Sequence, residues 1–348
     1  MSAGLQDLLA PAQQEAPPSG VEPAGDRPRS ISPGFATSDK VFRYSTRSVG
    51  VLVMALVGSI GLYLGYKAIP TLRHYGLSYF TQLHFAPERD RVGIPAFLVG
   101  SIEVAVVAIV LALPVALGMA LFITEYAPPR LRSLLVAVID LLSAVPSIIY
   151  AIWGAYLLQP HLVFVAHWLQ TYLGWIPVFK VDGDPRRAQL AQANYTNSIF
   201  IAALIIAAMI VPLACSLMRE VFSQTPVGER EAALALGSTR WGVVRSVVLP
   251  FGRSGIIGGT MLSLGRALGE TIIVVLILSS HEQISPRILQ NGGDTITSLI
   301  TSHFGDASSS QLSALLAAGF FLFLLTLLIN TLAGLVIARS RSGAATEL

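Results

Sequence analysis

The chain has 348 residues, of which 53% are hydrophobic and only 12% are charged. Soluble globular proteins carry about 25% charged residues, so this composition indicates a chain that spends much of its length in lipid. The formal net charge of +3 argues against a long basic surface for nucleic acid, and the single cysteine, Cys215, excludes an internal disulfide or a thiolate metal site.

The first segment, residues 1–46, is rich in Pro, Ala, Gly, Gln and Ser and has no sustained apolar period. A segment of this composition cannot bury enough apolar surface to fold. No apolar core with a small-residue cleavage site follows Met1 closely, so the segment is not typical of a signal peptide. We expect a disordered cytoplasmic N-terminal tail, followed by residues 47–96 as the first transmembrane helix and an outer loop.

Counting the span within residues 47–96, the sequence contains six apolar runs, each of roughly the 20 residues that a helix needs to cross a bilayer. The fold class predicted from them is an all-α polytopic membrane protein with six transmembrane helices. Residues 97–339 should form the transmembrane core, and residues 340–348 a cytoplasmic C-terminal tail. The predicted spans are Ser48–Tyr66, Phe97–Ile123, Leu134–Leu158, Ser198–Leu217, Gly255–Leu278 and Leu315–Ala338.

The distribution of Lys and Arg predicts the orientation of these spans. Six spans place both termini on the same side of the membrane. The segments on that side hold more Lys and Arg than the others, and they hold them closer to the spans. Because cytoplasmic segments carry such an excess, both termini are predicted to be cytoplasmic.

The long inner loop between the fourth and fifth spans, residues 219–253, has a helical pattern rather than the composition of a linker. Glu229–Glu231 place acidic side chains in a first helical turn, as the helix dipole favours. Ala232 and Ala233 favour helix and leave a small face that a partner can approach. Gly237 is expected to end this helix.

A second helix is expected directly after this one. Ser238 or Thr239 can cap it, so that it starts at about Trp241, and Pro250 should stop it before the fifth span. Together the two helices predict a short, rigid helix-turn-helix at the cytoplasmic surface. Such an element can transmit force from a partner into the fifth span.

This loop resembles the EAA motif of ABC importer permeases, because it has the pattern E-A-A-x3-G-x9-V-x-L-P with Val in place of the usual Ile. The resemblance implies a type I ABC importer permease (MetI-like) fold. It also implies that the loop is the coupling helix that docks into a groove of a separate ATPase subunit. The implied ATPase-coupling residues are Glu231, Ala232, Ala233, Gly237, Leu249 and Pro250.

The sequence contains no Gly-x4-Gly-Lys-Ser/Thr loop to hold the phosphates of a nucleotide. We therefore expect a transport subunit rather than an enzyme. It should have no cofactor or metal of its own, and ATP and Mg should be bound by the partner ATPase.

Two charges, Arg266 and Glu270, lie near the middle of the predicted fifth span. They are one helical turn apart, so they are expected to share a face of the helix. An Arg at the bilayer centre costs about 2.5–3.5 kcal/mol, so this face should line the bundle interior or a water-filled pathway. Both residues are candidates for the substrate pathway, because the planar Arg side chain matches phosphate oxygens and keeps its charge. The alternative is a buried ion pair that fixes helix packing.

The segment Gly265–Thr271 resembles the Gly-Arg-Ala-x-Gly-Glu-Thr segment of phosphate-importer permeases. Leu141–Gly154 resembles the same family's Pro-Ser-Val-Val-Tyr stretch, and the resemblance extends from about residue 90 to the C-terminus. Trp153 and the outer insertion Gln159–Asn197 favour a PstC-type over a PstA-type subunit.

This resemblance implies a subunit that carries inorganic phosphate across the plasma (inner) membrane. The implied partners are a PstA-type second permease, a PstB-type pair of ATP-binding subunits, a PstS-type extracytoplasmic phosphate-binding protein and the lipid bilayer, without nucleic acid.

Two other functions remain open from the sequence. A permease for another oxyanion, such as sulfate or molybdate, would have a similar coupling loop. A secondary anion transporter would more often show duplicated halves with broken helices in matching positions, which the sequence does not show. Glu103, near the outer end of the second span, lies outside these motifs. Its side chain could pair with a base of a partner subunit, but we expect it to snorkel outward.

Overall fold

The computed structural model of the protein describes residues 37–181, 195–280 and 283–340. The chain divides into two compact units, residues 1–56 and residues 57–348, and the boundary falls within helix α1 (Thr37–Tyr75). The described part of the first unit is the start of α1, where Asp39 lies in the first turn as the helix dipole favours. Its apolar side chains, such as Val51 and Met54, are exposed, as expected for a helix in lipid.

The predicted N-terminal tail is therefore too long. Residues 37–46 were expected to be disordered, but they are helical and continue without interruption into the first predicted span. Residues 1–36 and 341–348 of the two predicted tails lie outside the described residues.

The second unit is almost entirely helical. After α1 come η1 (Gly76–Phe80), the strands β1 (Phe85–Ala86) and β2 (Arg91–Val92) with η2 (Pro87–Arg89) between them, α2 (Pro95–Leu121), η3 (Phe122–Tyr126), α3 (Pro129–Ser143), α4 (Ser147–Trp153), η4 (Gly154–Leu158), α5 (Gln159–Leu173) and η5 (Pro177–Phe179). They are followed by α7 (Ile199–Ser223), α8 (Val227–Ala235), α9 (Arg240–Val243), η6 (Val244–Val248), α10 (Leu249–Phe251), α11 (Arg253–Leu268), α12 (Ile272–Ile277), α13 (Ile296–His303) and α14 (Ser309–Ser340). The two strands form a short antiparallel ribbon.

Five helical segments of the described residues are long and apolar enough to cross a bilayer, and there are six if one bent pair of segments counts as a single span. The five are Asp39–Phe80, Pro95–Tyr126, Ser147–Leu173, Ile199–Ser223 and Ser309–Ile337, and the pair is Arg240–Phe251 with Arg253–Leu268, which meet at 66°. The predicted all-α polytopic fold is confirmed.

The third span differs from its prediction. It was expected over Leu134–Leu158, but α3 ends at Ser143 and α4 begins at Ser147. Pro146 lies between the two helices and accounts for the break. Proline has no N–H to donate to the helix, and it disfavours helical geometry in the residue before it. The candidate span instead continues through η4 into α5, so part of the predicted outer insertion is helix.

Helix α7 lies at the centre of the second unit, where it packs against α2, α3 and α11. Most of its side chains are buried, including Ile201, Ile205 and Ile206. The face of α2 that is buried consists largely of alanines at helical spacing, namely Ala105, Ala108, Ala112, Ala116 and Ala120. Small residues allow two helices to approach closely in a membrane, where packing rather than hydrophobicity drives association.

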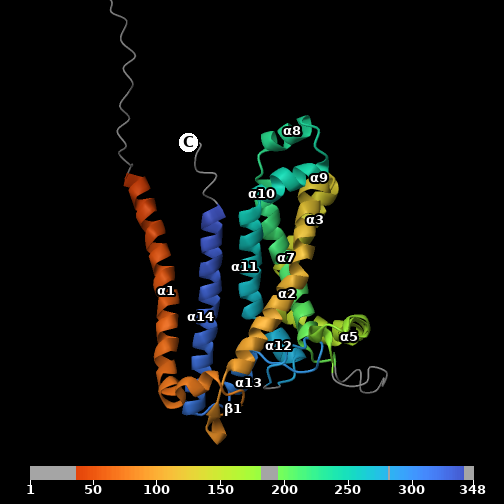
Figure 1. Ribbon diagram of the computed structural model, residues 1–348. Helices are drawn as coiled ribbons and strands as arrows, with labels where there is room; N and C mark the ends of the chain where they lie inside the picture. The colour runs from red at the N-terminus through yellow and green to blue at the C-terminus, as the bar shows by residue number, and fades with distance from the viewer. Residues whose placement is uncertain (1–36, 182–194, 281–282, 341–348) are drawn as a thin grey trace, which may run out of the picture. The chain divides into compact units, whose positions relative to one another are not determined.

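The elements of the second unit are distributed between two ends (Figure 1). Helices α8 and α9 lie at one end, and the ribbon, α13, α12 and α5 lie toward the other. Helices α7, α11 and α14 run between them.

Candidate functional site

The predicted fifth span, Gly255–Leu278, is not one continuous helix. Helix α11 ends at Leu268 and α12 begins at Ile272. Gly269 follows α11 directly, and glycine is a weak helix former. Thr297 of α13 donates its hydroxyl to the Glu270 carbonyl at 2.8 Å and so satisfies a backbone group that the break frees. The expectation that Arg266 and Glu270 share a helical face is therefore wrong.

Glu270 lies inside the break and is 7% exposed. Its Oε1 accepts a hydrogen bond from the backbone N–H of Ile273 at 3.3 Å, so the side chain caps the start of α12. A carboxylate at this position also interacts favourably with the helix dipole. The structure thus gives Glu270 a local role in shaping the break.

Arg266 lies in the last turn of α11, where a cation complements the helix dipole, and is half-buried. Within the described residues, no carboxylate forms an ion pair with Arg266. The predicted alternative of a buried Arg266–Glu270 ion pair is therefore absent from this part of the chain. Among the side chains of the described ranges, no acidic group therefore compensates the charge of this guanidinium.

Tyr150 of α4 lies close enough to Arg266 for the two side chains to interact electrostatically. Its hydroxyl donates to the Leu142 carbonyl at 3.0 Å, across the break at Pro146. Helix α4 also packs against α12. The structure therefore brings together two segments that are far apart in the sequence, one around Pro146 and one around Arg266.

The coupling loop has the predicted form in its first half. Helix α8 ends before Gly237, whose φ of +84° is a left-handed conformation that glycine adopts without strain. The N–H of Ser238 donates to the Ala233 carbonyl at 3.1 Å and completes the helix end. Thr239 caps α9 by accepting a hydrogen bond from the Gly242 N–H at 3.1 Å, as predicted.

The second helix ends within one residue of its predicted stop at Pro250. The chain continues through η6 and α10 only as far as Phe251 and bends at Gly252. A side chain at position 252 would meet the Phe222 ring at 2.2 Å, so the close approach requires glycine. The bend therefore depends on contact with α7, which is not visible in the local sequence.

Most of the predicted coupling residues lie on the surface. Glu231, Ala232, Gly237 and Pro250 are exposed, whereas Ala233 and Leu249 are half-buried against the core. The surface around them is apolar, because Val227, Leu234, Leu236 and Trp241 are also exposed. A cluster of exposed, large apolar side chains is typical of a protein–protein contact.

An ion pair that the sequence analysis missed anchors this loop. Arg230 of α8 lies 3.3 Å from Glu125 of η3, measured from Nη1 to Oε1. Its Nη2 also donates to the Phe222 carbonyl at the end of α7, at 2.7 Å. The two side chains are only 23% and 11% exposed, so they are screened less than a surface pair. Two features of the sequence could have indicated this pair. Glu125 is an isolated acid at the end of an apolar run, and Arg230 is a base within the coupling loop.

No group of three or more His, Cys, Asp or Glu side chains in the described ranges is arranged to hold a metal ion.

The chain is similar to a known protein family and to several named relatives. The family model of the binding-protein-dependent transport system inner membrane component matches residues 112–342. "Phosphate transport system permease protein PstC 2" of Mycobacterium tuberculosis is 40% identical over 85% of this chain and 90% of that protein. The PstC proteins of Mycobacterium leprae and Xylella fastidiosa are 40% and 37% identical, over 85% and 84% of this chain and 92% and 88% of theirs.

Two solved structures are also similar. The MetNI methionine ABC transporter in inward-facing conformations has a TM-score of 0.48 and 14% identity, over 69% of this chain and 93% of that chain. A bacterial ABC transporter involved in import of the acidic polysaccharide alginate has a TM-score of 0.48 and 16% identity, over 88% of this chain and 100% of that chain.

Proposed function

The chain belongs to the family of binding-protein-dependent transport system inner membrane components, and on that basis we propose that it is the permease subunit of an ATP-driven phosphate importer. The observation that carries this proposal is the 40% identity, over 85% of the chain, to a protein named as a phosphate transport permease. The multi-pass helical fold and the exposed coupling loop support it.

Arg266 is the proposed residue of the phosphate pathway. A multiply charged anion is costly to place within a bilayer, so a pathway needs a cation that keeps its charge there. Because Arg266 has no carboxylate partner in the described residues, its guanidinium is available to phosphate oxygens. Glu270 would support the pathway indirectly, by holding the break after α11 through its bond to Ile273.

Energy would reach this pathway through α8. We propose that its exposed apolar surface docks on a PstB-type ATPase pair, which binds ATP and Mg. The Arg230–Glu125 pair joins α8 to the ends of α2 and α7, and α10 leads through the bend at Gly252 into α11. Movement of the docked helix would thus be passed to the helix that carries Arg266. A PstA-type permease would complete the pathway, and a PstS-type protein would deliver phosphate.

The proposed orientation places the α8 end in the cytoplasm, together with both termini. The excess of Lys and Arg in the segments on this side supports it. The ribbon, α13 and the loop before η5 would then face the outside of the plasma membrane.

ATP hydrolysis by the complex reconstituted with its ATPase and binding protein tests the function. We expect phosphate-loaded binding protein to stimulate hydrolysis, and sulfate or molybdate to give no stimulation. Stimulation by sulfate or molybdate instead would assign the chain to another oxyanion. Phosphate uptake that proceeds without ATP would indicate a secondary anion transporter.

A further inference from the structure

Tyr150 of α4 lies beside the proposed phosphate pathway. Its side chain and that of Arg266 are both half-buried, and the two are near enough to interact electrostatically. Packing supports this proximity, because α4 packs against α12, and Tyr150 and Leu264 of α11 contact the same hydrophobic core. Several elements therefore hold the Tyr150 hydroxyl near the break between α11 and α12, where Arg266 lies.

The hydrogen of the Tyr150 hydroxyl has a fixed partner. The hydroxyl donates to the Leu142 carbonyl at 3.0 Å, and that carbonyl also accepts the Val145 N–H at 3.2 Å. Leu142 lies in the last turn of α3, where carbonyl groups lack helical partners and form the negative end of the helix dipole. Because a hydroxyl has a single hydrogen, the Tyr150 oxygen can only accept further hydrogen bonds.

Tyr150 and Arg266 thus offer opposite kinds of polar group. Both lie within the described residues, and no hydrogen bond joins their side chains. Arg266 offers N–H donors alone, whereas Tyr150 offers an oxygen acceptor. A small anion that contacts both would meet donors on one side and an acceptor on the other. This combination matches an oxyanion that carries a hydrogen of its own.

Phosphate and sulfate differ in this respect. At neutral pH phosphate keeps at least one of its hydrogens, whereas sulfate has none. A site that pairs with a hydroxyl of its substrate rejects an analogue that lacks this group, because a polar group of the site is then left unpaired. A sulfate oxygen that faced the lone pairs of Tyr150 would also be repelled, and such repulsion adds to specificity.

We propose that Tyr150 is a specificity-determining residue of the phosphate pathway, whose hydroxyl oxygen accepts the hydrogen of a phosphate held by Arg266. This inference rests on the proposed function and deepens it. A neutral acceptor suits the role, because a carboxylate in the same place would form an ion pair with the guanidinium and compete with the anion. The subunit would then select phosphate over sulfate itself, in addition to any selection by a binding protein.

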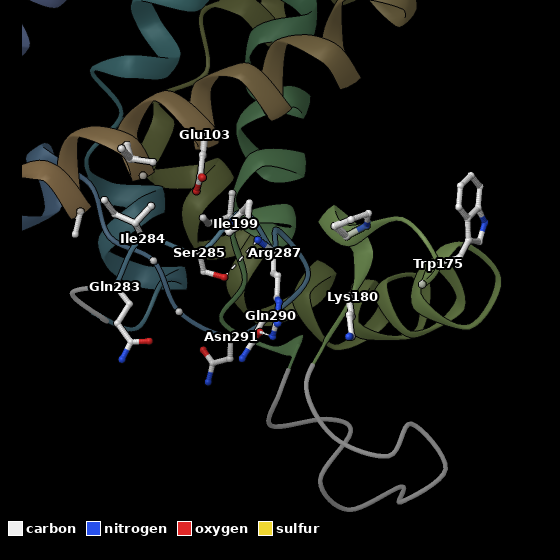
Figure 2. Close-up of a pocket in the computed structure, with 18 residues that line it drawn as sticks. Glu103, Trp175, Lys180, Ile199, Gln283, Ile284, Ser285, Arg287, Gln290 and Asn291 are labelled. Carbon is white, nitrogen blue, oxygen red and sulfur yellow. Dashed lines mark hydrogen bonds between the residues drawn. The ribbon is translucent and has the colours of Figure 1, made fainter. Parts of the chain in front are cut away.

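A second place where an anion can bind must be separated from this site in the experiment. A cavity of about 950 Å³ is lined by parts of α2, the segment around η5, the start of α7 and residues 283–293 (Figure 2). Glu103, which was expected to snorkel outward, lines this cavity together with Lys180, whereas Tyr150 and Arg266 do not. A variant of Arg266 therefore identifies which site an anion occupies.

Line broadening of inorganic phosphate in phosphorus NMR tests the inference in the detergent-solubilised permease–ATPase complex without binding protein. Titration gives the dissociation constant of phosphate, and competition gives that of sulfate. We expect Tyr150→Phe to weaken the binding of phosphate and not of sulfate, so that the preference for phosphate falls about fivefold, the effect of one net hydrogen bond. The matched control, Tyr156→Phe, alters an exposed tyrosine of the same span and should keep the wild-type preference.

Equal weakening of both anions in Tyr150→Phe would indicate a structural role, and that result or an unchanged preference would overturn the inference. Replacement of Tyr150 by 4-aminophenylalanine keeps a donor for the Leu142 carbonyl but presents a second N–H in place of the lone pairs. It should also lose the preference, and a wild-type preference in this variant would equally overturn the inference. Arg266→Gln should abolish the broadening. Broadening that persists in Arg266→Gln would instead contradict the proposed pathway at Arg266, and the role of Tyr150 with it.

Discussion

At the scale of single residues, Arg266 and Glu270 have different environments although they are close in sequence. The sequence shows that both charges lie near the middle of an apolar run, and it predicts that they face away from lipid. In the structure Glu270 is buried and Arg266 is half-buried. It does not show that they leave a common face. The Thr297 hydroxyl, which reaches the Glu270 carbonyl from another helix, helps to satisfy the backbone at the break that separates them. A tertiary contact of this kind has no local signal.

The Thr297 hydroxyl is expected to stabilise the break between α11 and α12. Replacing it in Thr297→Val leaves the Glu270 carbonyl without this donor, and should lower the stability of the protein by about 1–3 kcal/mol. The measurement is thermal unfolding in detergent. Thr301→Val is the matched control, because the exposed Thr301 hydroxyl only back-bonds to the Thr297 carbonyl of its own helix. Equal melting temperatures for both variants would contradict this role.

At the scale of elements, long uninterrupted apolar runs were predictable and interrupted ones were not. Helices α2, α7 and α14 contain their predicted spans within a few residues, because each run exceeds the length that a bilayer requires. The third and fifth spans were misplaced because hydropathy continues across Pro146 and Gly269, where the backbone does not remain helical.

The first half of the coupling loop was predictable because its structure is set locally. Its turn at Gly237 and its cap at Thr239 are set by local backbone chemistry, which the sequence displays directly. Its anchor is different, since Arg230 and Glu125 are 105 positions apart and meet only in the folded protein.

Loss of this anchor should weaken the link between ATP hydrolysis and transport. In Arg230→Gln, α8 loses its ion pair with η3 and its charged bond to α7. We expect less phosphate moved per ATP hydrolysed, at unchanged membrane insertion. The measurement is the ratio of uptake to hydrolysis in proteoliposomes.

Two further variants make this test specific. Arg132→Gln removes an exposed cation from the first turn of α3 and should leave the ratio unchanged. The exchange Glu125→Arg/Arg230→Glu restores the opposite charges and should recover part of the ratio. A wild-type ratio in Arg230→Gln would show that the anchor does not transmit movement.

At the scale of the whole molecule, the coupling surface around α8 and α9 and the β1–β2 ribbon lie toward opposite ends of the second unit (Figure 1). The account requires these ends to face opposite sides of the membrane. The native Cys215 is buried, so a cysteine introduced at the surface can be labelled selectively.

A cysteine at each end tests this orientation. Gly228→Cys in the first turn of α8 should react with a membrane-impermeant maleimide only in inverted vesicles, and Glu88→Cys beside the ribbon only in intact cells. The unmodified protein, with Cys215 alone, is the control for background labelling. Labelling of Gly228→Cys in intact cells would reverse the proposed orientation.

The central claim is that this subunit carries phosphate past Arg266 at the expense of ATP. The most direct measurement is ATP-dependent uptake of radioactive phosphate by proteoliposomes that contain the complete complex with wild-type protein or Arg266→Gln. We predict uptake by the wild type, undiminished by excess sulfate, and its loss in Arg266→Gln although that complex still assembles and hydrolyses ATP. Normal phosphate uptake by assembled Arg266→Gln would contradict the account.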